Sequence, residues 1–393
     1  MALQPAAGAR DLNPREVEAN RWLCDQLASV YRLWGYAEVS PPAVERLETL
    51  EAGGSIHNRE LVRLAAAEPL GLRPEMTASI ARAACTRLGQ RPRPLRLWSA
   101  GSVFRTVEGE TGPRFDERLQ SGVELLGDGT ADPVAGDAEL LGLLLACLRQ
   151  LGIRPSHQPV LLVGHHAVLT TLLEQVPAAQ RTATRQALIH YDPLALKQLD
   201  LPGHQLQTLQ GLMRLRGDVE PVLYQLEQWL GPTPVLDQLA QTLERLAPMA
   251  ARQGVKLQLD PSFQPHFDLY DGLVLKLVCR GAEVPVAIAS GGRYDTLVSR
   301  FGGPATGLGF GVDVEAVREL LGTEASAPIP QGRVLVAWAT PADLGPALDL
   351  LEHLHAEGQA AELLHGPCGS AAEADAIARQ RHCSEARWIQ GAA

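Results

Sequence analysis

The chain has 393 residues, 46% hydrophobic and 20% charged, so it is long enough for two domains and has the composition of a globular protein. Its net charge of −10, with a pI near 5.6, argues against a nucleic acid or another polyanion as the main partner. No apolar run approaches the roughly 18 residues of a membrane span, and the N-terminus has no signal-peptide pattern, so we expect a cytoplasmic protein.

The N-terminal third begins with an amphipathic helix. Apolar residues recur at helical spacing over residues 14–34, and Gly35 follows as a stop signal. A strand-like segment comes next, at 36–44. Its prolines, Pro41 and Pro42, exclude a central position in a sheet, so we expect this strand at an edge or an interface.

The next segments alternate between helix and strand. Residues 72–77 (LRPEMT) lead into an alanine-rich helix. Strands are expected at 95–104 and 117–126, separated by a polar loop that contains glycine. A strongly apolar helix is expected at 132–151.

The second half of the chain changes in texture. Residues from about 152 to 260 indicate short helices rich in Leu and Gln, which we interpret as an inserted helical subdomain. Two strands follow at 273–279 and 284–290. Small residues and two prolines mark a linker at 322–332. Residues 333–393 then alternate strand, helix, strand, helix and strand, which predicts a small α/β unit.

Cysteine usage points to reduced thiols. The six cysteines are scattered, with no CxxC pair. The pairs His365/Cys368 and His382/Cys383 invite a metal site, but their spacing fits no zinc template well. We therefore expect no metal and no cofactor.

A polar constellation surrounds the second expected strand. Arg105 ends the strand before it, and Gln120 and Glu124 lie four residues apart, with Gly122 between them. Because side chains on a strand alternate between its faces, residues 120, 122 and 124 share one face. An arginine, an amide and a carboxylate around an open space suit a small ligand that carries both an ammonium and an anionic group, such as an amino acid.

A series of short blocks in a fixed order resembles the class II aminoacyl-tRNA synthetases, and among them histidyl-tRNA synthetase. The blocks are GARD (8–11), the helix–strand–proline segment (15–42), LRPEMT (72–77), the arginine–loop–strand unit (105–127), SGGRYD (290–295) and GLGFGVDVEAV (307–317). The resemblance covers roughly residues 8–320. It implies an α+β fold, with an antiparallel or mixed sheet flanked by helices in a domain of residues 1–321.

The resemblance also implies the residues of a histidine site. In that family, two glutamates and a glutamine bind the α-amino group of histidine, and tyrosines lie near its imidazole. Charge-assisted hydrogen bonds of this kind are worth about 1.5–3 kcal/mol each. The positions implied here are Glu75, Thr77, Arg105, Gln120, Glu124, Tyr270 and Tyr294. Two structural interpretations stay open, in which Glu75 only caps its helix and Glu124 only pairs with an arginine.

The nucleotide side departs from the family pattern. The resemblance implies an arginine for the γ-phosphate, a catalytic arginine and an aromatic platform for adenine. The residues found at these and neighbouring positions are Ala316, Asp313, Pro265, Leu269, Arg118 and Val107. Without positive charge aimed at the phosphates, adenylation loses its main source of transition-state stabilisation. Rescue by Arg318 is the alternative, although two helical positions turn it well away from Ala316.

The C-terminal segment departs as well. Residues 333–393 hold four arginines and no lysine against eight acidic residues, a net charge near −4 that repels RNA phosphate. We therefore expect no tRNA partner, and a packing or partner-binding role for this segment.

A chain that keeps a histidine pocket but loses adenylation and tRNA reading resembles a paralogous family, the regulatory subunits of ATP phosphoribosyltransferase. That resemblance implies no catalytic residues, a short-form catalytic subunit as partner in a hetero-oligomer, L-histidine as a feedback ligand, and a dimer formed through residues 35–45. It leaves open whether histidine binds this chain, the partner or both. The alternatives are a divergent histidyl-tRNA synthetase and a synthetase-like protein with another role.

Overall fold

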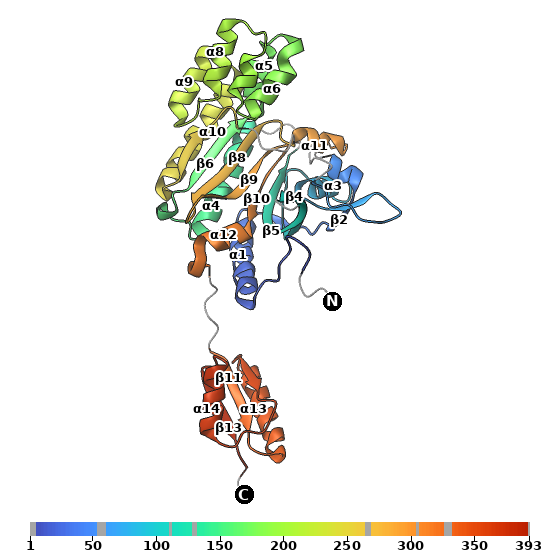
Figure 1. Ribbon diagram of the computed structural model, residues 1–393, viewed down its shortest axis with the longest axis vertical. Helices are drawn as coiled ribbons and strands as arrows, with labels where there is room; N and C mark the ends of the chain where they lie inside the picture. Colours follow the sequence, from blue (N-terminus) through green and yellow to red (C-terminus); the bar gives the residue numbers. More distant parts are fainter. Residues whose placement is uncertain are drawn as a thin grey trace. The chain divides into compact units, whose positions relative to one another are not determined.

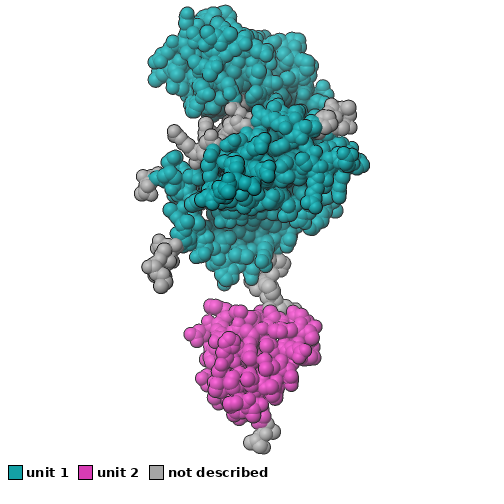
Figure 2. Space-filling view, turned by 90° about the vertical axis from the view of Figure 1, so that its right-hand side faces the viewer, with its two compact units in different colours: residues 1–325 teal, residues 326–393 magenta. Residues whose placement is uncertain are grey.

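The computed structural model of the chain describes residues 5–52, 60–109, 112–127, 132–263, 269–303, 306–325 and 332–391. The chain divides into two compact units, residues 1–325 and 326–393, which are coloured teal and magenta in Figure 2. Each unit contains hydrophobic clusters of its own. The linker predicted at 322–332 begins with a single 3-10 turn, Gly322–Glu324, and residues 326–331 lie outside the described part.

A mixed sheet organises the first unit. Among the described residues, its eight strands run in the order β1-β4-β5-β10-β9-β8-β6-β7. The pairs β1–β4 and β6–β7 are parallel and the other pairs are antiparallel. The strands are β1 (Ala37–Glu38), β4 (Leu95–Gly109), β5 (Gly112–Leu126), β6 (Val160–His165), β7 (Lys256–Leu259), β8 (Leu273–Arg280), β9 (Pro285–Arg293) and β10 (Gly307–Asp313), with a separate two-stranded ribbon of β2 (Val44–Arg46) and β3 (Leu70–Leu72).

The hairpin of β4 and β5 is longer than the sequence predicts. Arg105, expected at the end of a strand, lies within β4, where it is paired with Asp116. The predicted loop was inferred from polar residues and a glycine. Backbone pairing continues through them because ladder hydrogen bonds do not require an apolar face.

Local sequence explains why the first helix, α1, starts and stops where it does. Asn13 accepts a hydrogen bond from the Glu16 backbone N–H, and the Glu16 side chain accepts one from the Asn13 N–H, which makes a capping box. Pro14 occupies the first turn, where its missing N–H costs nothing. Gly35 follows the helix with a φ of +80°, a conformation that favours glycine.

Helices cover both faces of the sheet. Apolar residues of α1, α4 and α12 pack against the face that carries Trp98, Val123 and Phe310. Residues of α3 and α11 pack against Leu97 and Val103 on the opposite face. In the described part of the first unit, the helices outside residues 152–260 are α1 (Pro14–Leu33), α2 (Leu47–Glu51), α3 (Thr77–Cys85), α4 (Pro133–Gln150), α11 (Asp295–Arg300) and α12 (Val314–Leu321). This mixed sheet flanked by helices confirms the predicted fold class.

The segment from about 152 to 260 is not purely helical. It begins with β6 and ends with β7, and both strands extend the main sheet. The run VLLVGH that forms β6 is short and apolar, and periodicity alone does not separate such a strand from a buried helix. Of the helices between these strands, α5, α6, α8 and α9 lie beyond that end of the sheet (Figure 1), whereas α10 packs against α4. The helices of this segment are α5 (His166–Glu174), α6 (Arg181–Ile189), α7 (Pro193–Lys197), α8 (Gly203–Leu212), α9 (Val219–Leu230) and α10 (Pro234–Gln253), with 3-10 turns at Pro155–His157, before β6, and at Ala178–Gln180.

The second unit is a small parallel sheet between two helices. Its elements are β11 (Val334–Trp338), a 3-10 turn (Pro341–Asp343), α13 (Leu344–Ala356), β12 (Ala361–Leu363), α14 (Ala371–Gln380) and β13 (Glu385–Ile389). The strand order is β12-β11-β13. Alternate residues of β11 enter different clusters, with Val334 and Val336 beside α13 and with Leu335 and Ala337 beside α14. This period of two is that of a strand buried on both faces.

Candidate functional site

The predicted polar residues of β5 lie over glycines of the neighbouring strand. Glu124 is paired with Gly309 of β10, and Gly122 is paired with Gly311. A Cβ atom added to Gly309 would lie 1.8 Å from Glu124 Oε2, and one added to Gly311 would lie 2.0 Å from Gln120 Nε2. The two side chains therefore lean across β10, in space that only glycine leaves open.

Glu124 is a buried carboxyl group held by hydroxyl groups. Thr77 Oγ1 donates to Glu124 Oε1 at 2.7 Å, and the Tyr294 hydroxyl donates to Oε2. The interpretation that Glu124 pairs with an arginine is therefore not the arrangement in the described residues. Burial raises the pKa of Glu124 to about 8, although the two hydroxyl donors oppose the shift.

Glu75 caps the first turn of α3. Its carboxylate accepts hydrogen bonds from the backbone N–H groups of Thr77 and, at 3.0 Å, of Ala78. The capping interpretation left open by the sequence is thus the arrangement present here. Burial raises the pKa of Glu75, and the N–H donors counteract that effect. Thr77 links the two carboxyl groups, because its N–H binds Glu75 and its hydroxyl binds Glu124.

An arginine and two tyrosines complete this group. Arg105 Nε donates to the Pro74 carbonyl oxygen at 3.0 Å, which places the guanidinium beside the Glu75 segment. The Tyr270 ring packs against Gly292, where an added Cβ would lie 2.8 Å from a ring carbon. Tyr294 is fully buried. Burial raises the pKa of both tyrosines, so their hydroxyls remain neutral hydrogen-bonding groups.

The structure thus brings Glu75, Thr77, Glu124 and Tyr294 into one hydrogen-bonded cluster, with Arg105 and Tyr270 close enough to act electrostatically on its carboxyl groups. Gln120 lies on the same face of β5 as Glu124, with Gly122 between them. Its Oε1 atom is buried and has no hydrogen-bond partner among the described residues. A buried amide oxygen without a donor is an open position for a polar ligand.

Three contributors escaped the sequence analysis. Gly309 and Gly311 provide the space described above, and glycines inside a strand such as β10 are a signal for close approach of other groups. Asp271 accepts hydrogen bonds from the backbone N–H groups of Asp295 and Thr296. It therefore ties the segment after Tyr270 to the segment after Tyr294, which no sequence pattern indicates.

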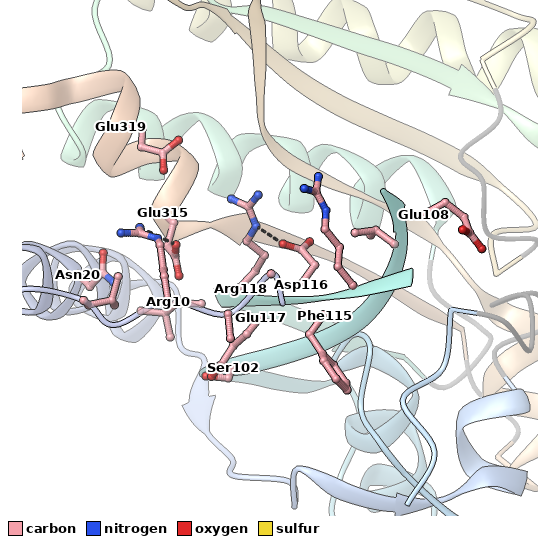
Figure 3. Close-up of a pocket in the computed structure, with 16 residues that line it drawn as sticks. Arg10, Asn20, Ser102, Glu108, Phe115, Asp116, Glu117, Arg118, Glu315 and Glu319 are labelled. Atoms are coloured by element: carbon pink, nitrogen blue, oxygen red, sulfur yellow. Dashed lines mark hydrogen bonds and ion pairs between the residues drawn. The ribbon is translucent and has the colours of Figure 1, made fainter. Parts of the chain in front are cut away.

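A cavity of about 480 Å³ opens beside the cluster. Arg105, Gln120 and Gly311 contribute to its wall, together with Lys276 and Ser290 from β8 and β9. A second cavity, of about 670 Å³, shares residues 116, 118 and 119 with the first and extends to the N-terminal segment (Figure 3). The open space thus continues from the polar cluster toward α1 and α12.

Most of the residues that depart from the family pattern on the nucleotide side line these two cavities. Asp313 Oδ1 accepts a hydrogen bond from the Ala316 N–H at 2.9 Å and so caps α12. Arg118 is at the position expected to stack on adenine. Its Nε atom donates a hydrogen bond to Asp116 Oδ1 at 2.9 Å (Figure 3). Val107 borders the larger cavity and Leu269 is buried in a hydrophobic cluster. Pro265 lies outside the described residues.

Arg318 points toward α1. Its Nη1 atom donates to Asn20 Oδ1 at 2.8 Å, and its Nη2 atom lies 3.5 Å from Glu16 Oε1. The side chain is buried. A guanidinium held in this way cannot also reach the cavity beside Ala316.

Two further observations concern the described residues as a whole. None of their helices combines the length and apolar character needed to cross a membrane. Nor do three or more His, Cys, Asp or Glu side chains gather there in a way that would hold a metal ion.

The family profile of histidyl-tRNA synthetase matches residues 8–317. An ATP phosphoribosyltransferase regulatory subunit from Synechococcus sp. is 52% identical over 99% of this chain and 100% of its own length. One of the same name from Prochlorococcus marinus is 50% identical over the same shares. The chain belongs to the family of ATP phosphoribosyltransferase regulatory subunits, which are histidyl-tRNA synthetase-like proteins.

Solved structures agree with this family. A crystal structure from Bacillus halodurans, described as an ATP phosphoribosyltransferase regulatory subunit/histidyl-tRNA synthetase, superposes with a TM-score of 0.81 at 27% identity, over the full length of both chains. A histidyl-tRNA synthetase from Nostoc sp. superposes with a TM-score of 0.75 at 20% identity, over 97% of this chain and 90% of the other, and this likeness shows the fold alone. The match to the regulatory-subunit family therefore includes the second unit.

Proposed function

We propose that this chain is the non-catalytic regulatory subunit that a short-form catalytic subunit of ATP phosphoribosyltransferase needs for activity in the first step of histidine biosynthesis. The observation that carries the proposal is the 52% identity, over nearly the whole chain, to a protein of that name. Identity at this level over both units weighs more than the synthetase fold, because a fold alone does not determine function. A cytoplasmic location is part of the proposal.

The nucleotide side of the site supports a non-catalytic role. Ala316 cannot donate a charge-assisted hydrogen bond to a phosphate, and Asp313 adds a carboxyl group close by. Arg318 is engaged with α1. Because losing one charge-stabilising donor typically costs on the order of 10²–10³ in rate, losing several is expected to abolish useful adenylation.

The polar cluster supports a sensing role for L-histidine. We propose that the ligand's ammonium group binds among Glu75, Gln120 and Glu124, with the imidazole toward Tyr270 and Tyr294. Gln120 Oε1 is an acceptor without a partner among the described residues, which suits an ammonium donor. A ligand that favours one state of the complex by about 1–3 kcal/mol would produce feedback inhibition of a useful size.

The decisive experiment is an assay of phosphoribosyl-ATP formation by a purified short-form catalytic subunit, with and without this chain. Strong activation, reversed by L-histidine, is the expected result. No activation by the cognate catalytic subunit would remove the proposal. Histidine-dependent exchange of pyrophosphate into ATP by this chain alone would then favour the divergent synthetase.

The histidine site has its own test. Replacing Glu124 by Ala removes a carboxyl group from the proposed ammonium site, so calorimetry is expected to show weaker histidine binding by the folded variant. Glu227→Ala, on the exposed side of α9, is the matched control and is expected to bind normally. Unchanged binding by Glu124→Ala would place the histidine site elsewhere, on this chain or on the partner.

We also propose that the chain forms a two-fold dimer through residues 35–45, as the synthetase resemblance implies. The short strand β1 lies at an edge of the main sheet, which leaves one side of its backbone without a neighbouring strand among the described residues. Light scattering of the purified chain is expected to give twice the mass of the monomer. A monomer over the micromolar range would contradict this part of the proposal.

A further inference from the structure

The two carboxyl groups of the cluster are joined through one residue but face different kinds of donor. Both oxygens of Glu75 accept from backbone N–H groups, those of Thr77 and Ala78. Both oxygens of Glu124 face hydroxyls, those of Thr77 and Tyr294. This difference decides which carboxyl group can hold a proton.

Burial raises the pKa of Glu75, but its donors favour the ionised form. A backbone N–H can only donate. The N–H groups of Thr77 and Ala78 therefore each require a lone pair on an oxygen of the Glu75 carboxylate. The group also lies at the N-terminus of α3, where the helix dipole stabilises negative charge. Adding a proton to Glu75 would set an O–H against an N–H and lose one of these bonds.

Glu124 is arranged to hold a proton while the site is empty. A hydroxyl both donates and accepts, so the Thr77 hydroxyl can donate to one carboxyl oxygen while the O–H of the other donates to Tyr294. The group is only 4% exposed, and a second carboxyl group, Glu75, acts on it at close range. The hydroxyls can accommodate the proton, although as donors they lower the pKa, and burial outweighs them and raises the pKa of Glu124 to about 8.

Among the described residues, no cationic side chain forms an ion pair with Glu124. Tyr270 and Tyr294 are neutral, since burial raises the pKa of each hydroxyl. Arg105 donates from Nε to the Pro74 carbonyl oxygen, on the Glu75 side of the cluster. A ligand ammonium would thus supply a positive charge that the described residues do not place at Glu124.

We propose that an amino-acid ligand exchanges its ammonium group for the proton of Glu124, so that each binding event releases a proton and couples occupancy of the site to pH. The inference rests on the proposed histidine site. On binding, the O–H bond of the Glu124 carboxyl group breaks and the proton passes to the solvent. The carboxylate that remains forms a charge-assisted pair with the ligand ammonium, which compensates the new negative charge at Glu124.

The sign of the pH dependence follows from this exchange. Below the pKa of free Glu124, binding has to remove a proton, so apparent affinity falls by up to tenfold for each unit of decreasing pH. Above that pKa the carboxylate is already formed and affinity levels off. The regulatory response to histidine is therefore expected to weaken as the cytoplasm becomes more acidic.

Calorimetry at pH 7.5 in buffers of different ionisation enthalpy measures the number of protons released on histidine binding. With a pKa of about 8, Glu124 contributes roughly 0.8 proton, whereas the ligand's own imidazole contributes roughly 0.1. Glu124→Gln keeps an oxygen that accepts from Thr77 but carries no titrating proton. Release near 0.8 in the native chain that disappears in Glu124→Gln would support the inference.

Three results would overturn it. Histidine binding with roughly 0.1 proton released would remove the exchange and leave the proposed function intact. Undiminished release by Glu124→Gln would assign the proton to another group. No histidine binding by the native chain, alone or with its catalytic subunit, would remove the proposed histidine site itself.

A second measurement does not depend on whether the variant binds. In the native chain with ¹³C-labelled glutamate, one side-chain carboxyl resonance is expected to titrate near pH 8, and Glu124→Gln is expected to lack it. Saturating histidine is expected to keep that resonance in its ionised position throughout the neutral range. If every glutamate of the unliganded chain titrates below pH 6, Glu124 carries no proton to exchange.

Discussion

At the scale of single residues, the site separates groups that face a ligand from groups that hold them. The sequence placed Glu75 and Thr77 among the ligand-binding residues. In the structure Glu75 caps α3, and Thr77 spans the two carboxyl groups. Thr77 thus positions Glu124 and Glu75 holds Thr77, while the contact of these residues with a ligand stays a prediction. Gln120 keeps a buried acceptor without a partner among the described residues.

Gly311 provides a residue-scale prediction. Replacing it by Ala puts a methyl group where the Gln120 side chain lies, and the three nearest atoms all belong to that side chain. The chain is therefore expected to fold, but with Gln120 displaced and histidine binding weakened about tenfold, because a hydrogen bond to a charged group is lost. Calorimetry measures the change.

The control is Gly203→Ala at the start of α8, where an added Cβ meets no atom within 4 Å. It is expected to bind histidine like the native chain. Equal binding by Gly311→Ala would mean that Gln120 does not contact the ligand.

At the scale of elements, a buried ion pair joins three parts of the first unit. Asp137 of α4 lies 2.6 Å from the Arg293 guanidinium of β9. Gln238 of α10 donates to the same carboxylate at 2.8 Å. Through Asp137, the strand that precedes Tyr294 is thereby linked to α10 of the 152–260 segment. The same interactions therefore hold both the proposed histidine site and that segment in place.

Removing one partner of this pair leaves the other charge buried and uncompensated. Asp137→Ala is therefore expected to lower the free energy of unfolding of the first unit by about 3–5 kcal/mol, measured by urea denaturation. Asp218→Ala removes one half of the exposed pair with Lys256 and serves as the control, with a far smaller expected change. Equal losses for the two variants would show that the buried pair has no special role.

At the scale of the whole molecule, each unit has the core it needs. The clusters of the first unit are built from residues up to 325, and those of the second from residues 334–389. Because stability comes mainly from burial within one core, the units are expected to fold separately. The proposed histidine site belongs wholly to the first unit.

A chain cut to residues 1–325 tests this separation. It is expected to unfold cooperatively at the urea midpoint of the first unit in the full chain and to bind histidine with the same affinity. Circular dichroism and calorimetry measure the two properties. An aggregated fragment, or one that has lost histidine binding, would mean that the second unit supports the first.

Much of the fold could be predicted because its signals are local. The helical spacing of apolar residues in α1 and the stop at Gly35 act between neighbours in the chain, so the helix appears in the sequence itself. The shared face of Gln120 and Glu124 is likewise a property of one strand. The length of the β4–β5 hairpin and the strand β6 were missed, because partners distant in sequence decide whether polar or ambiguous segments pair.

By itself, the sequence determined most of the elements, which depend on local periodicity, and the chemical types of the polar residues, which depend on residue identity. The mixed synthetase-like fold followed from the resemblance of its short blocks to a known family. Only the tertiary structure decided which of those residues touch. Thr77 and Glu124 are 47 positions apart, and Tyr294 and Glu124 are 170 apart. Whether a carboxyl group meets an N–H, a hydroxyl or an arginine depends on contacts across such separations, and those contacts set the charge that Glu124 carries.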